Sequence, residues 1–280
     1  MTKTAFAPGK IILSGEYAVV FGFPGIAVPS SMGMTATFEQ KLSLNFLQIE
    51  WQGIDERWKK YLGMIISECA KHHGDVFCGI LTIKNQLPLG RGMGSSTALV
   101  IAVCRALLGD DCENVAHQIE DHVNPGNSGL DFAVIWNGKP VSFTRGKPPS
   151  TLSLNLNFLQ NSVLIDTGMP GESTPELVSW MKSQQSTVKT QLERIGRCTE
   201  RLIGGESPMT VFRDHHQAQV ALGVVPERVQ DLIREIERNE GSAKVIGAGG
   251  RTGGAGMVLA LHKHTAIVEK LAEKFTMPVL

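Results

Sequence analysis

Residues 88–98 read Pro-Leu-Gly-Arg-Gly-Met-Gly-Ser-Ser-Thr-Ala, and they lie between a strand-like segment, residues 79–86, and the apolar stretch 99–108. This order predicts a glycine-rich loop that leads from a strand into the first turn of a helix. The backbone N–H groups of such a turn and the positive end of the helix dipole form an anion site, which favours a phosphate. Glycine at positions 90, 92 and 94 lets the backbone approach a ligand without interference from a Cβ atom.

The same loop also has simpler and rival interpretations. A glycine-rich turn with a serine cap explains the residues without a ligand, although Ser95 and Ser96 also bring hydroxyls that can reach a metal ion. The loop lacks the Gly-Lys-Ser/Thr of a Walker A motif, and the third glycine of a dinucleotide fingerprint would fall at Ser95. The loop alone therefore indicates a phosphate site and favours a nucleotide.

The composition is typical of an enzyme that acts on a small metabolite. The 280 residues include 27 basic and 27 acidic side chains, so no nucleic acid or anionic membrane partner is expected. The N-terminus does not read as a signal peptide, and Arg105 interrupts the longest apolar stretch, so we expect no membrane span and a cytoplasmic location. Five scattered cysteines without a Cys-x-x-Cys pair suit a reducing compartment, and we expect them to be small core residues.

The spacing of apolar residues predicts an α+β chain. Helices are expected over residues 55–72, 95–108, 113–123, 174–202 and 226–239, with a further helix and a short strand closing the chain. Strands are expected over residues 11–13, 17–20, 42–46, 79–86, 152–158, 163–166, 243–246 and 257–261. Thr174 before Pro175 suits a helix N-cap with proline at the first helical position. A change of composition near residue 157 predicts two domains, residues 1–157 and 158–280.

Two further segments, taken with the glycine loop, resemble the motifs of one kinase family. Residues 7–22 read Ala-Pro-Gly-Lys-Ile-Ile-Leu-Ser-Gly-Glu-Tyr-Ala-Val-Val-Phe-Gly, and residues 244–256 read Lys-Val-Ile-Gly-Ala-Gly-Gly-Arg-Thr-Gly-Gly-Ala-Gly. In this order the three segments resemble the three motifs of the GHMP small-molecule kinases, and among these the chain is most similar to mevalonate kinase. The resemblance spans nearly the whole chain. It implies the α+β GHMP kinase fold, with an N-terminal S5-domain-2-like domain that binds ATP and substrate and a C-terminal ferredoxin-like domain.

A fourth segment, residues 120–131, extends the resemblance. It reads Glu-Asp-His-Val-Asn-Pro-Gly-Asn-Ser-Gly-Leu-Asp. In mevalonate kinases a glutamate on a helix precedes a loop that ends Pro-Ser-Gly-hydrophobic-Asp. Glu120 and Asp131 keep the family's separation, but Pro125 here stands three residues before Ser128, whereas the family's proline adjoins its serine. The departure changes how the loop approaches a substrate and leaves the aspartate in place.

The resemblance implies a kinase that uses ATP and Mg²⁺ and has an alcohol as acceptor. Such a transfer needs a positioned hydroxyl, a proton acceptor for it and positive charge around the transferred phosphate. Asp131 is implied as the proton acceptor or orienting charge, with Lys10 beside it. Ser96 and Glu120 are implied as the Mg²⁺ ligands. By composition alone, Lys10 and Glu120 would be solvated charges and Asp131 a helix cap.

Two larger groups of residues follow from the same resemblance. The group expected to bind ATP is Gly90, Gly92, Met93, Gly94, Ser95, Ser96 and Thr97. The group expected to bind the acceptor is Glu16, Tyr17, Ser128, Gly129, Thr174 and Gly249. Helix capping alone also explains a hydroxyl at position 174.

The acceptor is expected to be mevalonate, phosphorylated at its 5-hydroxyl, with the Tyr17 hydroxyl donating a hydrogen bond to it. Mevalonate kinases usually have Gly-Glu-His where this chain has Gly15-Glu16-Tyr17, and Gly-Glu-Tyr instead resembles bacterial phosphomevalonate kinases. A phosphorylated acceptor should need a further cation, for which Arg91, Lys139 and Arg145 are the nearby candidates. Phosphomevalonate kinase and a catalytically idle GHMP-type ligand sensor therefore stay as alternatives.

Some polar residues lie outside this scheme. Arg251 and Thr252 lengthen the third motif, and we expect Arg251 to point to water rather than to phosphate. The histidine pairs at positions 72 and 73, 215 and 216, and 262 and 264 are expected to be solvated and not metal ligands. A small molecule is the expected partner, and a homodimer is left open.

Overall fold

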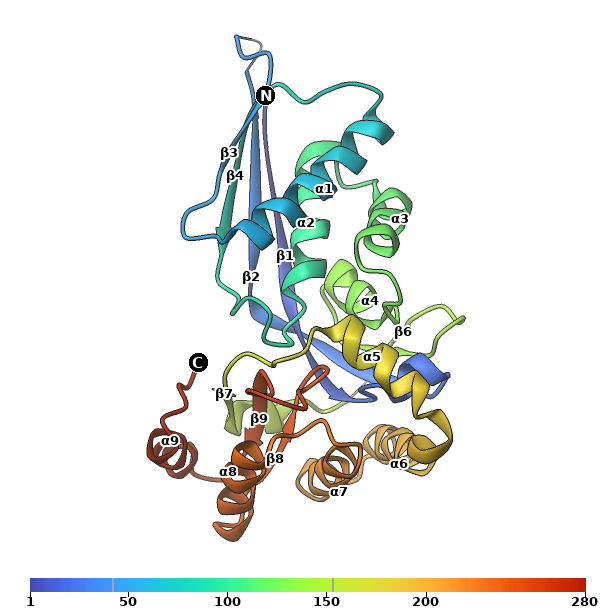
Figure 1. The fold of residues 1–280 in the computed structure, drawn as a ribbon, viewed down its shortest axis with the longest axis vertical. Helices are drawn as coiled ribbons and strands as arrows, with labels where there is room; N and C mark the ends of the chain where they lie inside the picture. The colour runs from blue at the N-terminus through green and yellow to red at the C-terminus, as the bar shows by residue number, and fades with distance from the viewer. Residues whose placement is uncertain (42, 153) are drawn as a thin grey trace. The chain divides into compact units, whose positions relative to one another are not determined.

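A computed structural model describes residues 1–41, 43–152 and 154–280 of the chain (Figure 1). These residues form two compact units. The first unit consists of Met1–Lys10, Pro29–Leu89 and Gly94–Lys139, and the second of Ile11–Val28, Gly90–Met93 and Pro140–Leu280. The units follow spatial contacts rather than chain order, so the domain boundary after residue 157 stays a prediction.

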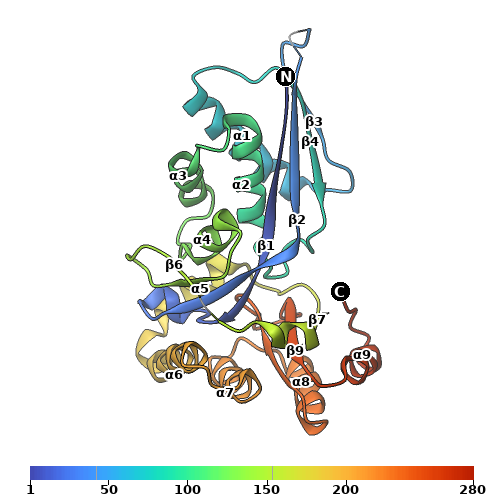
Figure 2. The ribbon, with the colours of Figure 1, turned by 180° about the vertical axis from the view of Figure 1, so that it is seen from behind.

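The first unit is a sheet with helices on one face (Figures 1 and 2). Its strands are the first part of β1 (Thr2–Ser14), the second part of β2 (Gly25–Gln40), β4 (Gly79–Asn85) and β3 (Leu47–Glu50). Strand β2 pairs with β1 and runs antiparallel to β4, and β4 pairs with β3 in parallel. The helices are α1 (Glu56–His73), α2 (Ser95–Leu108), α3 (Glu113–Val123) and α4 (Leu130–Asn137).

Local chemistry explains where the first of these helices begins and ends. The side chain of Asp55 accepts a hydrogen bond from the backbone N–H of Trp58 (3.0 Å) and caps the N-terminus of α1. The helix ends at Gly74, which takes the left-handed conformation that a side chain would disfavour. Helix α2 is buried along nearly its whole length, which explains why its sequence is apolar on all sides.

The second unit is built on the three-stranded antiparallel sheet β7-β9-β8. These strands are β7 (Ser162–Asp166), β9 (Met257–Leu261) and β8 (Ser242–Val245), and the helices that pack on them are α7 (Pro208–Ala221), α8 (Glu227–Arg238) and α9 (Thr265–Lys274). The remaining elements of this unit are η1 (Ala18–Phe21), β5 (Val141–Phe143), β6 (Ser150–Thr151), η2 (Asn157–Asn161), α5 (Thr174–Ser183) and α6 (Gln185–Ile203). Within the described residues, no helix is both long enough and apolar enough to cross a bilayer.

Most predicted elements are confirmed to within two residues, and the exceptions have local causes. The strand predicted over 17–20 is wrong, because Tyr17 has a positive φ (61°) and starts the short helix η1. The strand predicted over 152–158 is also wrong: the Asn155 side chain accepts from the N–H of Asn157 (3.0 Å) and turns the chain into η2. Residue 153 of that stretch and residue 42 lie outside the described residues. The described part of the strand predicted over 42–46 is wrong, because residues 43–46 form a turn and β3 begins at Leu47. The strand predicted over 11–13 is the end of the longer strand β1.

The long helix predicted over 174–202 is two helices, α5 and α6, which meet at Gln184. The first residue of α5 is Thr174, and its N-cap is Ser173 rather than the predicted Thr174. The Glu176 carboxylate accepts hydrogen bonds from the backbone N–H and the hydroxyl of Ser173, both at 2.7 Å. This capping box fixes the start of α5. Helices α4 and α7 and the long strand β2 were not among the predicted elements.

The second unit encloses a buried group of ionisable side chains from residues far apart in the sequence. Glu16, Lys244 and His215 are each at most 2% exposed. The Lys244 ammonium donates to one oxygen of Glu16, and Nε2 of His215 lies 2.9 Å from the other. Burial alone would raise the pKa of Glu16, but Lys244 and His215 outweigh it and hold that pKa at about 2. The group therefore keeps an ionised glutamate inside the core.

Replacing Glu16 should destabilise the second unit in a pH-dependent way. Glu16→Gln removes the carboxylate that faces Lys244, and breaking a buried ion pair costs about 3–5 kcal/mol. The pKa of Glu16 falls from 4.5 to about 2 on folding, which corresponds to about 3 kcal/mol of stability. Because the folded-state pKa is the lower one, this contribution is complete above pH 4.5 and is lost as the pH falls toward 2.

Denaturant unfolding at pH 7, 4 and 3 measures the effect. The difference in the free energy of unfolding between wild type and Glu16→Gln should be largest at pH 7 and should shrink at pH 3. Glu200→Gln, on the exposed surface of α6, is the matched control and should stay close to wild type at every pH. An equal loss at all three pH values would show that the ionisation of Glu16 contributes nothing.

Gly94, at the start of α2, is a position where no other residue fits. Its φ is +74°, and a Cβ atom there would lie 2.9 Å from both Cγ of Lys10 and Cδ1 of Ile135. The glycine thus lets the helix N-terminus lie directly against the side chain of Lys10, which is 3% exposed.

Gly94→Ala should therefore lower the free energy of unfolding by at least about 1–2 kcal/mol, the cost of a left-handed backbone in a residue with a side chain. Gly63→Ala is the matched control, because Gly63 lies on the exposed face of α1 with nothing within 4 Å of the added carbon. It should raise the stability by about 0.5–1 kcal/mol, since alanine favours a helix interior. Denaturant unfolding of both variants tests the pair, and a neutral Gly94→Ala would contradict the steric argument.

Candidate active site

The N-terminus of α2 in the first unit has the form expected of an anion site. Gly94 is the N-cap, and the first intrahelical hydrogen bond runs from the N–H of Ala98 to the carbonyl of Gly94 (2.9 Å). The amides of Ser96 and Thr97 lie ahead of that bond, at the positive end of the helix dipole. This end of the helix can therefore hold a phosphate group.

Lys10 of β1 and Asp131 of α4 lie together in the same unit. The Lys10 Nζ is 3.2 Å from Oδ1 of Asp131, and the two side chains are 3% and 34% exposed. A lysine buried to this degree needs a carboxylate partner. Gly129, with φ at +88°, is the N-cap of α4 and puts Asp131 in its first turn. The ion pair thus holds a partly exposed carboxylate in a fixed position.

Glu120 of α3 is a buried carboxylate, 2% exposed, with only one oxygen satisfied. Its Oε1 accepts a hydrogen bond from the Thr97 hydroxyl (2.7 Å), whereas Oε2 has no hydrogen-bond partner among the described residues. Burial raises the pKa of Glu120 to about 7, against the lowering effect of Thr97, and the charge of Asp131 adds to the rise. A cation beside Oε2 would both satisfy that oxygen and restore the charged form, so Glu120 fits the predicted role of a metal ligand.

Tyr61 of α1 lies close to Glu120 and was assigned no role in the helix predicted over residues 55–72. Its hydroxyl accepts a hydrogen bond from the side-chain amide of Asn124 (2.7 Å). Burial and the charge of Glu120 raise the pKa of Tyr61 above its ordinary value, so the hydroxyl keeps its proton. A polar atom on the buried face of α1 was the signal that could have identified it.

The other half of the glycine loop lies in the second unit, against the third motif. A Cβ atom on Gly92 would lie 2.6 Å from the carbonyl oxygen of Ile246, and the N–H of Met257 donates to the carbonyl of Arg91 (3.0 Å). Met93 is fully buried. Gly92 is thus required for close packing of two backbone segments, whether or not a ligand is bound.

Gly249 and the residues after it also have structural partners in the second unit. A Cβ atom on Gly249 would lie 2.2 Å from the carbonyl oxygen of Val224, so the glycine permits a close backbone contact. The Glu172 carboxylate accepts from the N–H of Arg251 (2.9 Å) and from the hydroxyl of Thr252 (2.9 Å). The Arg251 guanidinium lies 4.4 Å from the centre of the Trp180 ring. Arg251 is exposed, as expected, and its guanidinium also stacks on an aromatic ring.

Two residues expected to bind the acceptor make other contacts within the second unit. Glu16 is inside the buried ion group described above. Tyr17 is 5% exposed, and its hydroxyl donates to the carbonyl of Ala248 (2.5 Å). Neither side chain presents a polar atom to a substrate in this structure. The expected hydrogen bond from Tyr17 to mevalonate is therefore replaced by one to the backbone of the third motif.

The remaining acceptor residues are more accessible. Thr174 is exposed at the start of α5 in the second unit, and Ser128 precedes α4 in the first unit. The Ser128 hydroxyl accepts from the N–H of Leu130 (3.2 Å), which stabilises the turn before Asp131.

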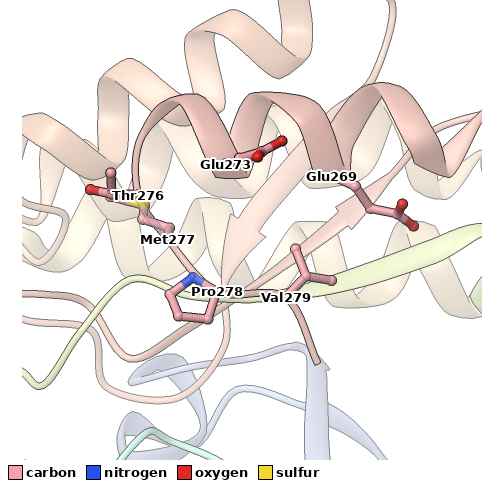
Figure 3. Close-up of a pocket in the computed structure, with 6 residues that line it drawn as sticks. All are labelled: Glu269, Glu273, Thr276, Met277, Pro278 and Val279. Carbon is pink, nitrogen blue, oxygen red and sulfur yellow. The ribbon is translucent and has the colours of Figure 1, made fainter.

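Three of the six paired histidines differ from expectation, whereas His72, His73 and His264 are exposed as predicted. His215 is fully buried, and His216 and His262 are each 7% exposed, so these three are not solvated. Among the described residues, no three His, Cys, Asp or Glu side chains gather as a metal cluster would. A hollow in the second unit contains none of the candidate residues (Figure 3). It is lined by Glu269, Glu273, Thr276, Met277, Pro278 and Val279.

Comparison with known proteins agrees with this geometry. The family model "GHMP kinases N terminal domain" matches residues 60–139. The mevalonate kinase of Thermococcus sibiricus is 24% identical over 330 residues, which cover 100% of this chain and 96% of that protein.

Two solved structures share the fold. The mevalonate kinase of Methanococcus jannaschii has a TM-score of 0.78 at 18% identity, covering 100% of this chain and 96% of that one. A Streptococcus pneumoniae phosphomevalonate kinase, in complex with phosphomevalonate and AMPPNP, also has a TM-score of 0.78, at 15% identity, covering 100% and 98%. The fold alone therefore does not distinguish the two acceptors.

The matched region contains the first turn of α2 together with Glu120 and Asp131, and the alignment with the Thermococcus protein runs through the first and third motifs as well. The architecture agrees along the whole chain. The chain is therefore similar to GHMP kinases in residues 60–139 and to a mevalonate kinase over its whole length.

Proposed function

We propose that the chain transfers the γ-phosphoryl group of ATP to the 5-hydroxyl of mevalonate and yields 5-phosphomevalonate. The observation that carries the proposal is the ion pair between buried Lys10 and partly exposed Asp131. The first turn of α2 and the Glu120 carboxylate, in the same unit, supply the phosphate and cation sites that such a transfer needs. The full-length similarity to a protein named as mevalonate kinase supports the choice of acceptor.

In this mechanism Asp131 hydrogen-bonds the acceptor hydroxyl and takes its proton as the oxygen attacks the γ-phosphorus, while the bond from that phosphorus to the β–γ bridging oxygen breaks and ADP leaves. Lys10 fixes the direction of the carboxylate through the 3.2 Å ion pair. Its ammonium also offsets negative charge on the attacking oxygen and on the transferred phosphate. The amides at the start of α2 hold the nucleotide phosphates by hydrogen bonds that need no rearrangement.

Ser96 and Glu120 are the side chains that would hold Mg²⁺. Glu120 fits because its Oε2 is buried and lacks a hydrogen-bond partner among the described residues. When bound, the cation neutralises phosphate charge and leaves room for water in its coordination shell. Binding would also keep Glu120 ionised.

Phosphomevalonate is the second candidate acceptor. Arg91 of the glycine loop is a candidate cation for the phosphate of this acceptor. Its guanidinium already pairs with a carboxylate, since its Nε lies 3.3 Å from Oδ2 of Asp166. The Gly15-Glu16-Tyr17 motif gives no direct information about the acceptor, because Glu16 and Tyr17 are buried and bonded within the second unit. An idle sensor is disfavoured by the intact pairing of Lys10 with Asp131. A cytoplasmic location and a homodimer remain proposals.

The acceptor can be tested directly with the purified chain. The chain is incubated with ATP, Mg²⁺ and one of four compounds, and ADP release is measured. The compounds are mevalonate, phosphomevalonate, galactose and homoserine. Rapid ADP release is expected with mevalonate alone. Turnover with phosphomevalonate instead of mevalonate would show that phosphomevalonate is the acceptor. A lack of ADP release with every compound would favour the sensor.

Asp131→Asn should lower kcat by about 10²–10⁴-fold and leave nucleotide affinity nearly unchanged, because the amide keeps the shape and removes the base. Lys10→Met should also lower kcat more than it raises the KM for ATP, since its charge acts mainly in the transition state.

Steady-state kinetics and nucleotide titration measure both changes. Asp111→Asn, on an exposed turn of the same unit, is the matched control and should behave as wild type. An Asp131→Asn variant with near wild-type kcat would show that Asp131 is structural.

A further inference from the structure

The loop between Glu120 and Asp131 is held by one asparagine side chain. Nδ2 of Asn127 donates a hydrogen bond to Oδ1 of Asp121 (2.9 Å) and a second to the carbonyl of Asn124 (3.1 Å). The backbone N–H of Asn127 also donates to that carbonyl (3.2 Å). An asparagine amide has two protons, so one side chain can make both contacts. Asn127 therefore ties the loop to the last turn of α3, which bears Asp121.

The other end of the same segment contacts α3 one turn earlier. The ring of His117 packs edge-on against Phe132, the residue after Asp131, with ring centres 4.8 Å apart and an interplanar angle of 73°. Four residues separate His117 from Asp121 on α3, and Nδ1 of His117 lies 3.3 Å from Oδ2 of Asp121. Residues 127–132 are thus held to α3 at both ends, and Asp131 lies between the two contacts.

The residues between these contacts form the turn that leads into α4. The Ser128 hydroxyl accepts a hydrogen bond from the backbone N–H two residues later (3.2 Å), and Gly129 is the left-handed N-cap of α4. Asp131 is the second residue of that helix, and its carboxylate lies 3.2 Å from Nζ of Lys10. Lys10 thus holds the carboxylate itself, whereas Asn127 holds the start of the turn that places the backbone of Asp131.

The backbone of the loop offers little restraint of its own. Gly126 is exposed, has a φ of +84°, and leaves open space around an added Cβ atom. Proline fixes the φ angle of its own residue, but Pro125 stands three residues before Ser128. The residue next to Ser128 is Asn127, and its side-chain hydrogen bonds supply the restraint at that position.

We propose that Asn127 is a positioning residue for phosphoryl transfer: by bonding to Asp121 it fixes the turn before α4 and so sets the direction in which Asp131 meets the acceptor hydroxyl. The inference rests on the proposed function, because that function makes Asp131 the proton acceptor. The proposed nucleotide contacts are made by the start of α2. Loosening the turn should therefore impair transfer and spare nucleotide affinity.

Asn127→Asp tests the inference with a side chain of nearly the same size. The new carboxylate lacks the amide protons and faces the carboxylate of Asp121, so two like charges meet at the contact that holds the loop. The kcat with mevalonate should fall by roughly 10- to 100-fold, because a misplacement of about 1 Å can cost a factor of about 10². The KM for ATP and the affinity for ADP should stay at their wild-type values.

Exchanging the two groups gives the reciprocal test. In the double variant Asn127→Asp/Asp121→Asn, the amide at position 121 can donate to the carboxylate at position 127, so part of the lost kcat should return. Recovery is partial, because the carboxylate still faces the carbonyl of Asn124. Asp121→Asn alone keeps an oxygen that accepts from Asn127 and should lower kcat less than Asn127→Asp does.

Asn45→Asp is the matched control. Residue 45 is exposed in a bend of the same unit, so the same exchange of amide for carboxylate there should leave the kinetics at wild-type values. Hydrogen–deuterium exchange and thermal unfolding separate a loosened turn from a loss of fold. In Asn127→Asp the backbone amides of residues 127–132 should exchange faster, with a melting temperature close to that of wild type.

Three results would overturn the inference. The first is an Asn127→Asp variant with wild-type kcat, even where the turn exchanges faster. The second is a double variant that is no more active than Asn127→Asp. The third is a loss of ADP affinity as large as the loss of kcat, which would indicate a general disturbance of the unit.

These results are distinguishable from a failure of the proposed function. If wild type phosphorylates phosphomevalonate instead of mevalonate, the proposed acceptor is wrong, and kcat with phosphomevalonate then tests Asn127 in the same variants. If wild type phosphorylates none of the four compounds, the proposed function fails, and the role of Asn127 in transfer fails with it.

Discussion

A buried ammonium group governs the arrangement of the first unit's candidate site. Lys10 lies almost fully inside the protein, where a positive charge is tolerated only beside a carboxylate, and Asp131 is that carboxylate. The lysine side chain also lies against Gly94, so the helix that offers its N-terminus to a phosphate must begin with a residue lacking a side chain. One electrostatic requirement therefore fixes a strand, a glycine and the first turn of another helix relative to one another.

The sequence predicts those parts of the structure that depend on neighbours in the chain. Helix α2 follows from an apolar stretch after a glycine loop, and α1 from its spacing and its Asp55 cap. The pairing of Lys10 with Asp131 came from family resemblance, since nothing in the spacing of two residues so far apart indicates a contact. The strand expected over 152–158 fails because the side chain of Asn155 bonds to the local backbone, a competition that alternation of apolar residues does not reveal.

The roles of individual polar residues were harder to predict than their positions. Glu16 is part of the first motif, yet its partner Lys244 is 228 residues away, so its burial could not be predicted from neighbouring residues. Tyr61 shows the opposite case, in which a residue with no predicted role has a hydroxyl bonded to Asn124 at the end of α3. Both errors arise because a motif records which residue type is present and not which atoms face it.

The contacts between the first and third motifs also bear on how the chain folds during synthesis. Lys244 donates hydrogen bonds to the carbonyl of Ile12 and to Glu16, and the carbonyl of Ala248 accepts a hydrogen bond from the hydroxyl of Tyr17. The polar groups of residues near the beginning of the chain therefore find their hydrogen-bond partners only when residues near its end are present. Contacts of such long sequence separation form slowly, because a long loop must close first. A nascent chain on the ribosome would hold the segment around Glu16 unfinished until Lys244 has emerged, which makes this segment a natural substrate for chaperones.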